Sequence, residues 1–166
     1  SSLMDGLTVS AAYVPSDGTT QVESSEDYGF KYTGVEGLTI GAATGDDNTS
    51  ATAGVETTNM YVTYAMDAFT VGYQTSEADS ETTNADVDFT ALGISYAVTD
   101  DMSISLNSST HEYENSTKSD QEATGISVSY TMGSMTIKAN HNTIDNIAGT
   151  ATDDRSGYAL SLGFTF

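Results

Sequence analysis

Few residues in this sequence could take part in acid–base chemistry near neutral pH. The two histidines, His111 and His141, are the natural candidates, and His111 lies beside Glu112 and close to Glu114. Asp100 and Asp101 are two further carboxylates that are adjacent in the sequence, but they lie in a predicted turn far from both histidines. No spacing typical of a Ser–His–Asp triad can be inferred. These residues therefore do not predict an enzyme.

Carboxylates are the most abundant charged groups, and several of them are clustered. Their oxygens could bind divalent cations, although no cluster has the spacing of a calcium-binding loop. The alternative is a solvated acidic surface, so the sequence predicts no cofactor beyond possible divalent cations. If these residues lined the entrance of a pore, they would raise the local concentration of cations. The clusters are Glu23, Glu26 and Asp27; Asp46 and Asp47; Glu77, Asp79 and Glu81; and Asp153 and Asp154.

Composition excludes several classes of function. The 166 residues suit one domain, here residues 1–166. Four basic residues against 24 acidic ones argue against nucleic acid, whose phosphates need Lys and Arg contacts. The absence of cysteine excludes disulfides and thiolate metal sites. No apolar run approaches the roughly 18 residues of a membrane-spanning helix, so a membrane-spanning form would have to be a closed β-barrel.

The last twelve residues, 155–166, show how the strands are built. Large apolar residues alternate there with small or weakly polar ones, and successive side chains of a strand point to opposite faces. A strand with lipid on one side and a water-filled lumen on the other has this pattern. The large residues are Tyr158, Leu160, Leu162, Phe164 and Phe166.

The same pattern recurs along the chain as five pairs of strands. Ascending segments begin with Leu7, Leu38, Phe69, Met102 and Met135, at spacings of 31, 31, 33 and 33 residues, and the last of them is predicted to end at His141. Descending segments end on Tyr32, Tyr64, Tyr96 and Tyr130, with Phe164 in the fifth place. This repeat predicts an all-β, antiparallel up-and-down transmembrane barrel with about ten strands. Val87 and Phe89 are out of phase with Leu92 and Ile94, which predicts a bulge or a late strand start.

The predicted connections alternate in length, as in outer-membrane barrels with short periplasmic turns. The short links are 33–37, 65–68, 97–101 and 131–134, and the long ones are 15–25, 46–57, 77–86, 112–122 and 144–154. Aromatic rings near the short links would form a periplasmic girdle at the level of the lipid headgroups. Its predicted members are Tyr32, Tyr64, Tyr96, Tyr130, Phe164 and Phe166. An outer girdle could use Tyr13, Tyr28, Tyr73, Tyr113 and Tyr158.

The residues between the large ones would line the lumen. A soluble β-sandwich is the alternative, but small hydroxyl and glycine side chains cannot fill a packed interior. Hydroxyls and amides can hydrate a passing solute without binding it tightly. Three of the four basic residues fall on this face, where their charge avoids lipid. The predicted pore-lining residues are Lys31, Asn59, Thr63, Gln74, Ser95, Ser105, Asn107, Ser127, Lys138, Asn140 and Arg155.

Three segments carry a resemblance to a known family: 31–45 (KYTGVEGLTIGAATG), 64–74 (YAMDAFTVGYQ) and 158–166 (YALSLGFTF). They resemble the carboxy-terminal part of a Gram-negative general diffusion porin of the alphaproteobacterial type. The resemblance implies a barrel of about 16 strands, a homotrimer in the bacterial outer membrane, and passive diffusion of small hydrophilic solutes and ions. The chain lacks the family's amino-terminal strands and inward-folded loop, so it is expected to be part of a longer chain.

Two further expectations accompany this interpretation. The partners would be membrane lipid and lipopolysaccharide, to which divalent cations could bridge the acidic residues. The alternative is a self-contained ten-stranded barrel that acts as an adhesin, a receptor or a protease, because long polar loops would also suit binding. Some ten-stranded outer-membrane barrels are proteases with acidic residues and a histidine at the outer rim, and His111 lies near the outer end of its predicted strand. By alternation His141 points outward.

Overall fold

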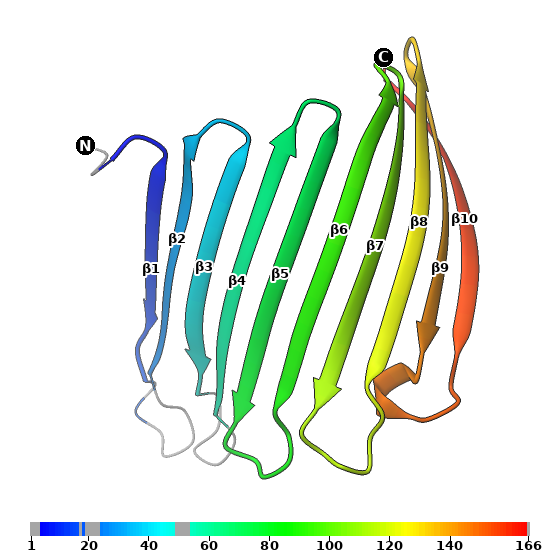
Figure 1. Ribbon diagram of the computed structural model, residues 1–166. Coiled ribbons are helices and arrows are strands. Elements are labelled where there is room, and N and C mark those ends of the chain that lie inside the picture. Colours follow the sequence, from blue (N-terminus) through cyan, green and yellow to red (C-terminus); the bar gives the residue numbers. More distant parts are fainter. Residues whose placement is uncertain (1–3, 17, 19–23, 49–53, 166) are drawn as a thin grey trace.

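The computed structural model describes residues 4–16, 18, 24–48 and 54–165, and its strands form one antiparallel sheet (Figure 1). Each strand pairs with its neighbours in sequence, from β1 to β10 without a crossover. No helix in these residues is long and apolar enough to cross a membrane. The elements are β1 (Leu7–Val14), β2 (Ser25–Val35), β3 (Leu38–Asp47), β4 (Val55–Met66), β5 (Phe69–Ser80), β6 (Val87–Thr99), β7 (Met102–Tyr113), β8 (Gln121–Met132), β9 (Met135–Asp145), the short 3₁₀ turn η1 (Ile147–Gly149) and β10 (Arg155–Phe164).

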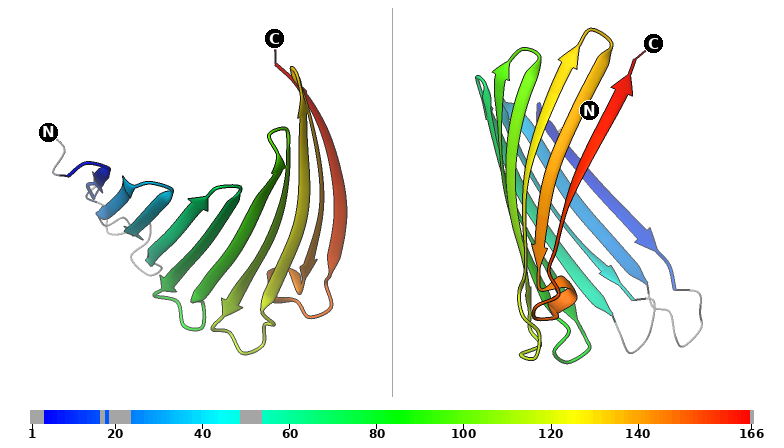
Figure 2. Two further views of the ribbon diagram at one scale, coloured as in Figure 1. Left: turned by 45° about the horizontal axis from the view of Figure 1, so that its top comes forward. Right: turned by 90° about the vertical axis from the view of Figure 1, so that its right-hand side faces the viewer.

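The predicted fold class is confirmed: the chain is all-β, antiparallel and up-and-down, with ten strands in the described residues. The sheet curves strongly toward the β10 end but does not close, because β1 and β10 lie at opposite edges (Figure 2). The ten strands therefore form a curved wall with one concave and one convex face.

Two-residue turns join the strands at one end of the sheet, at 36–37, 67–68, 100–101 and 133–134. Three of these turns use a residue at positive φ, as is common in two-residue hairpin turns: Gly37, Asp67 and Gly133 have φ angles of 74°, 51° and 60°. A Cβ on Gly37 would collide with the carbonyl oxygen of Ala65, so the turn also requires the missing side chain. The longer connections all lie at the other end (Figure 1).

The strands run further toward the long connections than the sequence predicts. The predicted long loops began at 46, 77 and 112, but β3, β5 and β7 continue to Asp47, Ser80 and Tyr113. Backbone pairing continues beyond the apolar alternation because the ladder bonds do not depend on side-chain polarity. As a result most of the clustered carboxylates lie in strands. Glu26, Asp27, Asp46, Asp47, Glu77 and Asp79 are strand residues, Glu81, Asp153 and Asp154 lie in loops, and Glu23 is outside the described residues.

The bulge or late strand start predicted around Val87 and Phe89 is wrong. β6 pairs in unbroken register from Val87 onward, with Val87 opposite Ala78 and Phe89 opposite Ser76. The register shifts next to β6 and β2 lie near the tight turns instead, between Ala97 and Thr99 and between Tyr32 and Val35. Phe89 therefore points to the opposite face from Leu92. The alternation of apolar and polar residues changes phase here because Val87 and Phe89 are apolar residues on the polar face. The strand itself is not interrupted.

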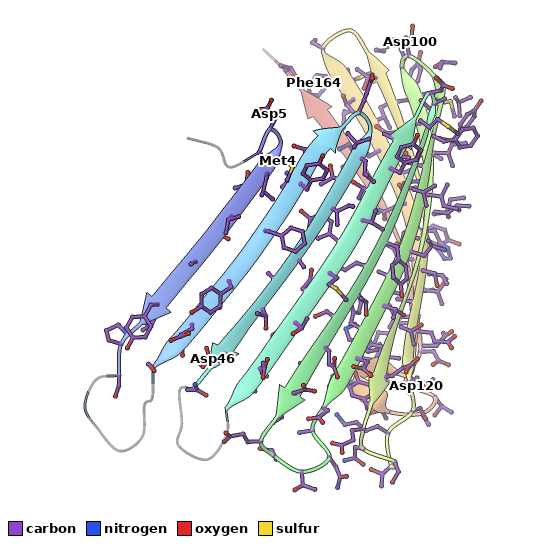
Figure 3. All side chains as sticks on the ribbon, turned by 60° about the vertical axis from the view of Figure 1, so that its left-hand side comes forward. Met4, Asp5, Asp46, Asp100, Asp120 and Phe164 are labelled. Atoms are coloured by element: carbon purple, nitrogen blue, oxygen red, sulfur yellow. The ribbon has the colours of Figure 1, made fainter. Side chains whose placement is uncertain are left out.

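The register assigns every strand residue to one of two faces, because directly paired residues point the same way. One face carries Tyr32, Leu106 and Leu160, and the other carries Lys31, Asn107 and Lys138. Figure 3 shows side chains, many of them rings, projecting from the convex side of the sheet. We call the face of Leu106 the convex face and the face of Asn107 the concave face.

The sheet has no dry packed centre. Among the described residues no hydrophobic side chain is fully buried; Leu160 is 77% exposed and Ile126 is 44% exposed. A β-sandwich would bury such side chains between its two sheets. An apolar convex face that none of the described residues covers needs an apolar medium outside the chain.

Candidate functional site on the concave face

The concave face is a polar surface built by rows of paired residues that cross the strands. Near the tight turns Thr131 and Thr136 are 3.1 Å apart between their Oγ1 atoms. In the next rows toward the centre, Ser129 pairs with Lys138, and the Ser105 and Ser127 hydroxyls are 2.6 Å apart. Hydroxyls both donate and accept hydrogen bonds, so these rows offer a small solute both kinds of partner.

The central row alternates glycine and asparagine. Gly93 pairs with Asn107, Asn107 with Gly125, and Gly125 with Asn142. A Cβ added to Gly125 would collide with the side-chain oxygens of both Asn107 and Asn142. The two carboxamides therefore lean toward each other over the glycine backbone.

The next row toward the long connections has a basic residue near each of its two ends. It runs from Lys31 on β2 through Gln74 on β5 to Arg155 on β10. The Arg155 Nε atom lies 3.8 Å from an Asp153 carboxylate oxygen, and both side chains are largely solvent-accessible. An ion pair that exposed contributes little to stability.

All of the predicted pore-lining residues lie together on the concave face. They are spread over β2, β4, β5, β6, β7, β8, β9 and β10, so they line the wall without converging on one point. By register this set is Lys31, Asn59, Thr63, Gln74, Ser95, Ser105, Asn107, Ser127, Lys138, Asn140 and Arg155.

Charge is distributed unequally between the two faces. The strands place three basic residues, Lys31, Lys138 and Arg155, and two acidic ones, Asp27 and Asp47, on the concave face. The chain as a whole has a formal charge of −20. The concave wall is therefore nearly neutral, although the protein is strongly acidic.

Carboxylates collect on the convex face at the long-connection end, where Figure 3 labels Asp46 and, beyond the strands, Asp120. Like charges stand directly opposite each other there, as with Asp88 between Glu77 and Glu112. In the described residues, no three His, Asp or Glu side chains are arranged to hold a metal ion. The strand carboxylates of this convex group are Glu26, Asp46, Glu56, Glu77, Asp79, Asp88, Glu112, Glu122 and Asp145.

An aromatic group stands at the long-connection end of the concave face. The Phe89 and His111 ring centroids are 4.7 Å apart, and Gln121 Nε2 lies 3.4 Å from His111 Nδ1. The Lys118 ammonium lies 4.4 Å from the Tyr113 ring centroid, a cation–π distance. Tyr113 was predicted for an outer girdle on the lipid side; that prediction is wrong, because Tyr113 shares the concave face with His111.

The two histidines lie on opposite faces of the sheet, and His111 does not share a face with Glu112. Glu112 follows His111 in β7 and so points to the opposite face. His141 lies on the convex face, with its ring centroid 4.3 Å from that of Tyr158.

The residues predicted for a periplasmic girdle lie on the convex face near the tight turns. Tyr32 pairs with Leu7, Tyr64 with Leu38 and Tyr130 with Met102. Tyr96 pairs with Phe69 at a ring distance of 4.5 Å, Phe164 pairs with Met135, and Phe166 lies outside the described residues. Each aromatic residue thus packs beside the apolar residue that begins the preceding strand.

Sequence reasoning missed Asn142 because the predicted ascending segment ended at His141. β9 continues to Asp145, and alternation places Asn142 on the same face as Lys138 and Asn140. A strand extended by one residue would have revealed it. No local feature of the sequence predicts that the Asn142 side chain lies over Gly125, because this contact depends on the register of three strands.

Comparison with known proteins identifies the family. A family profile described as Gram-negative porin matches residues 1–115. The chain belongs to the Gram-negative porin family. This confirms the predicted resemblance and places the protein in the bacterial outer membrane.

Solved structures agree with this fold at low sequence identity. The chain is similar to an anion-selective porin from Comamonas acidovorans, with a TM-score of 0.80 and 11% identity over 98% of this chain and 57% of that one. A mutant porin of Rh. blastica gives 0.69 and 17%, covering 98% and 64%, and OmpT of Vibrio cholerae gives 0.68 and 15%, covering 98% and 62%. No curated protein sequence matches the chain. This porin chain thus spans about three fifths of the structures that it resembles.

Proposed function

We propose that this porin chain forms part of the wall of a passive diffusion channel for small hydrophilic solutes and ions. The supporting observation is the division between the faces. The convex face is apolar except for the carboxylates near its long-connection end, and no described residue covers it, whereas the concave face is lined with hydroxyls, amides and few charges. A β-wall with lipid on one side and water on the other has this division.

The chemistry of the concave face suits diffusion better than tight binding. Conduction requires that a solute enter easily and also leave easily. Small neutral groups such as Ser105, Ser127 and Asn140 can replace part of a solute's hydration without strong attraction. The proposed channel is therefore weakly selective along this part of its wall.

The proposal extends to partners and assembly. Further strands of the same protein would close the barrel between β1 and β10, as the larger porins that share the fold suggest, and three such barrels would form a homotrimer. Lipid would contact the convex face, and lipopolysaccharide would lie near its carboxylates, with divalent cations as counter-ions and no resident cofactor. The protein would not be an enzyme, since His111 and Glu112 point to opposite faces.

Planar-bilayer recording of the protein that contains this chain tests the proposed function. Large, steady conductance steps with weak ion preference are expected for a water-filled pore. Peptide hydrolysis without any conductance would overturn the channel and favour a protease. Binding of surface ligands by a protein that conducts nothing would favour an adhesin.

A further inference from the structure

The paired carboxamides over Gly125 are the most specific feature of the concave face. Gly125 lies on β8 between Asn107 of β7 and Asn142 of β9. Two strands separated by a third are about 10 Å apart, so two extended carboxamides can meet only above the middle strand. Here they do so, because the glycine leaves the space that a side chain would fill.

Both carboxamides are available to a solute. Asn107 and Asn142 are exposed, and neither side chain has a hydrogen-bond partner among the described residues. Each carboxamide offers one oxygen acceptor and two N–H donors. The adjacent Ser105 and Ser127 hydroxyls, one row away, continue the same donor and acceptor surface.

The surroundings of the pair are mostly uncharged, and Arg155, one row away on the neighbouring strand β10, lies 3.8 Å from an Asp153 carboxylate oxygen. Besides the two asparagines and Gly125, its row contains Thr39, Thr63, Gly72, Gly93 and Gly157, none of which carries a charge. Lys138 is two rows away along β9, and the convex carboxylates point to the other side of the sheet. A neutral ligand that both donates and accepts hydrogen bonds fits this environment better than an ion does.

We propose that Asn107 and Asn142 form a weak recognition site for neutral polyhydroxylated solutes, such as hexoses, on the lumen side of the wall. Adjacent hydroxyls of one sugar would each donate to one carboxamide oxygen and accept from a carboxamide N–H. The site raises the local concentration of the sugar and so speeds its passage at low concentration. This proposal rests on the proposed channel and names a solute class for it.

The chain offers a matched pair of variants for the test. Gly125→Ala places a methyl group against both carboxamide oxygens and pushes them apart. Gly93→Ala adds the same methyl to the same row of the concave face, but its only close neighbour is the Leu106 carbonyl oxygen at 4.0 Å. Both variants narrow the lumen equally, so a difference between them reports the carboxamide pair.

The measurement is the swelling rate of liposomes carrying the protein, in a hexose and in a polyethylene glycol of equal hydrodynamic radius. We expect Gly125→Ala to lower the hexose-to-glycol ratio about threefold or more, since two weak hydrogen bonds are lost, whereas Gly93→Ala leaves it unchanged. An Asn107→Ala, Asn142→Ala double variant should act like Gly125→Ala, which keeps the test valid if the glycine variant fails to fold.

Conductance in potassium chloride separates the two proposals. If the unmodified protein conducts nothing, the channel itself is wrong. If all variants conduct normally and share one hexose-to-glycol ratio, the carboxamide site is wrong while the channel stands. A change in reversal potential with an unchanged ratio would mean that the asparagines bind a cation, which also overturns the sugar site.

Discussion

Lys138 carries one of the few charges on the concave face and has only hydroxyl neighbours in its row, Ser129 and Ser161. A charge in such a neutral setting should influence ions in the lumen more than one among many compensating groups. We predict that Lys138→Glu shifts the reversal potential toward cations in a potassium chloride gradient. Lys138→Gln should give about half that shift, because it removes one charge where Glu changes two.

The two variants form a charge series at one site, so any shift due to altered pore size alone would not scale with charge. An unchanged reversal potential in an open channel would place Lys138 away from the ion path.

Asp88 tests the carboxylates of the convex face. It stands directly opposite both Glu77 and Glu112, and like charges at such positions destabilise a sheet. We predict that Asp88→Asn stabilises the protein by about 0.5 kcal/mol at low ionic strength. The gain should shrink in high salt, because exposed charges are then screened.

Urea unfolding in lipid vesicles measures this difference. Glu36→Gln is the control, since Glu36 lies in a tight turn outside the paired strands and should change stability little. A loss of stability in Asp88→Asn at low salt would show that the convex carboxylates are held by favourable contacts.

At the scale of the strand, β10 tests the assignment of faces. Leu160 lies near its middle on the convex face, and Ala159 beside it lies on the concave face opposite Asn140. A charged side chain on the lipid face near the bilayer midplane costs about 2–4 kcal/mol. We predict this loss for Leu160→Arg and almost none for Ala159→Arg, as measured by the free energy of unfolding in vesicles.

The two substitutions introduce the same side chain one residue apart, so the contrast is independent of how well arginine suits a strand. Equal costs at both positions would mean that β10 does not separate lipid from water.

The strand pairs and the faces could be predicted because alternation is a local property of the sequence. Leu7 and Tyr32 mark the ends of strands by type and spacing alone, and the structure pairs them directly. The ends of the strands near the long connections could not be predicted in the same way. Polar residues such as Glu77 and Asp79 look like loop residues, yet backbone hydrogen bonds keep them in β5.

The change of phase at Phe89 was ambiguous for a different reason. A bulge and an apolar residue on the polar face produce the same irregularity in sequence, and only the register with His111 distinguishes them. The carboxamide pair was harder to predict from the sequence, because Asn107, Gly125 and Asn142 come from three different strands. Their meeting depends on pairings separated by many residues.

At the scale of the whole molecule, the chain separates its chemistry across the thickness of one sheet. Most strand carboxylates stand on the convex face near the long connections, the apolar belt occupies the rest of that face, and the concave face is nearly neutral. An overall charge of −20 therefore says little about the medium inside the barrel. It describes the carboxylates of the convex face, of the long connections and of the tight turns, where Glu36, Asp67, Asp100 and Asp101 lie.

The separation predicts a two-residue period of accessibility to water along each strand, and the chain is well suited to measuring it because it contains no cysteine. We predict that single cysteines at Ser103, Ser105 and Asn107 react with a charged, membrane-impermeant thiol reagent when the protein is in vesicles. Cysteines at Ile104 and Leu106 should react at least tenfold more slowly, because a thiol facing lipid meets neither water nor the reagent. In detergent-free, urea-unfolded protein all five should react alike, which controls for intrinsic reactivity. Uniform labelling along β7 in vesicles would mean that water reaches both faces of the sheet, and the protein would then be no membrane wall at all.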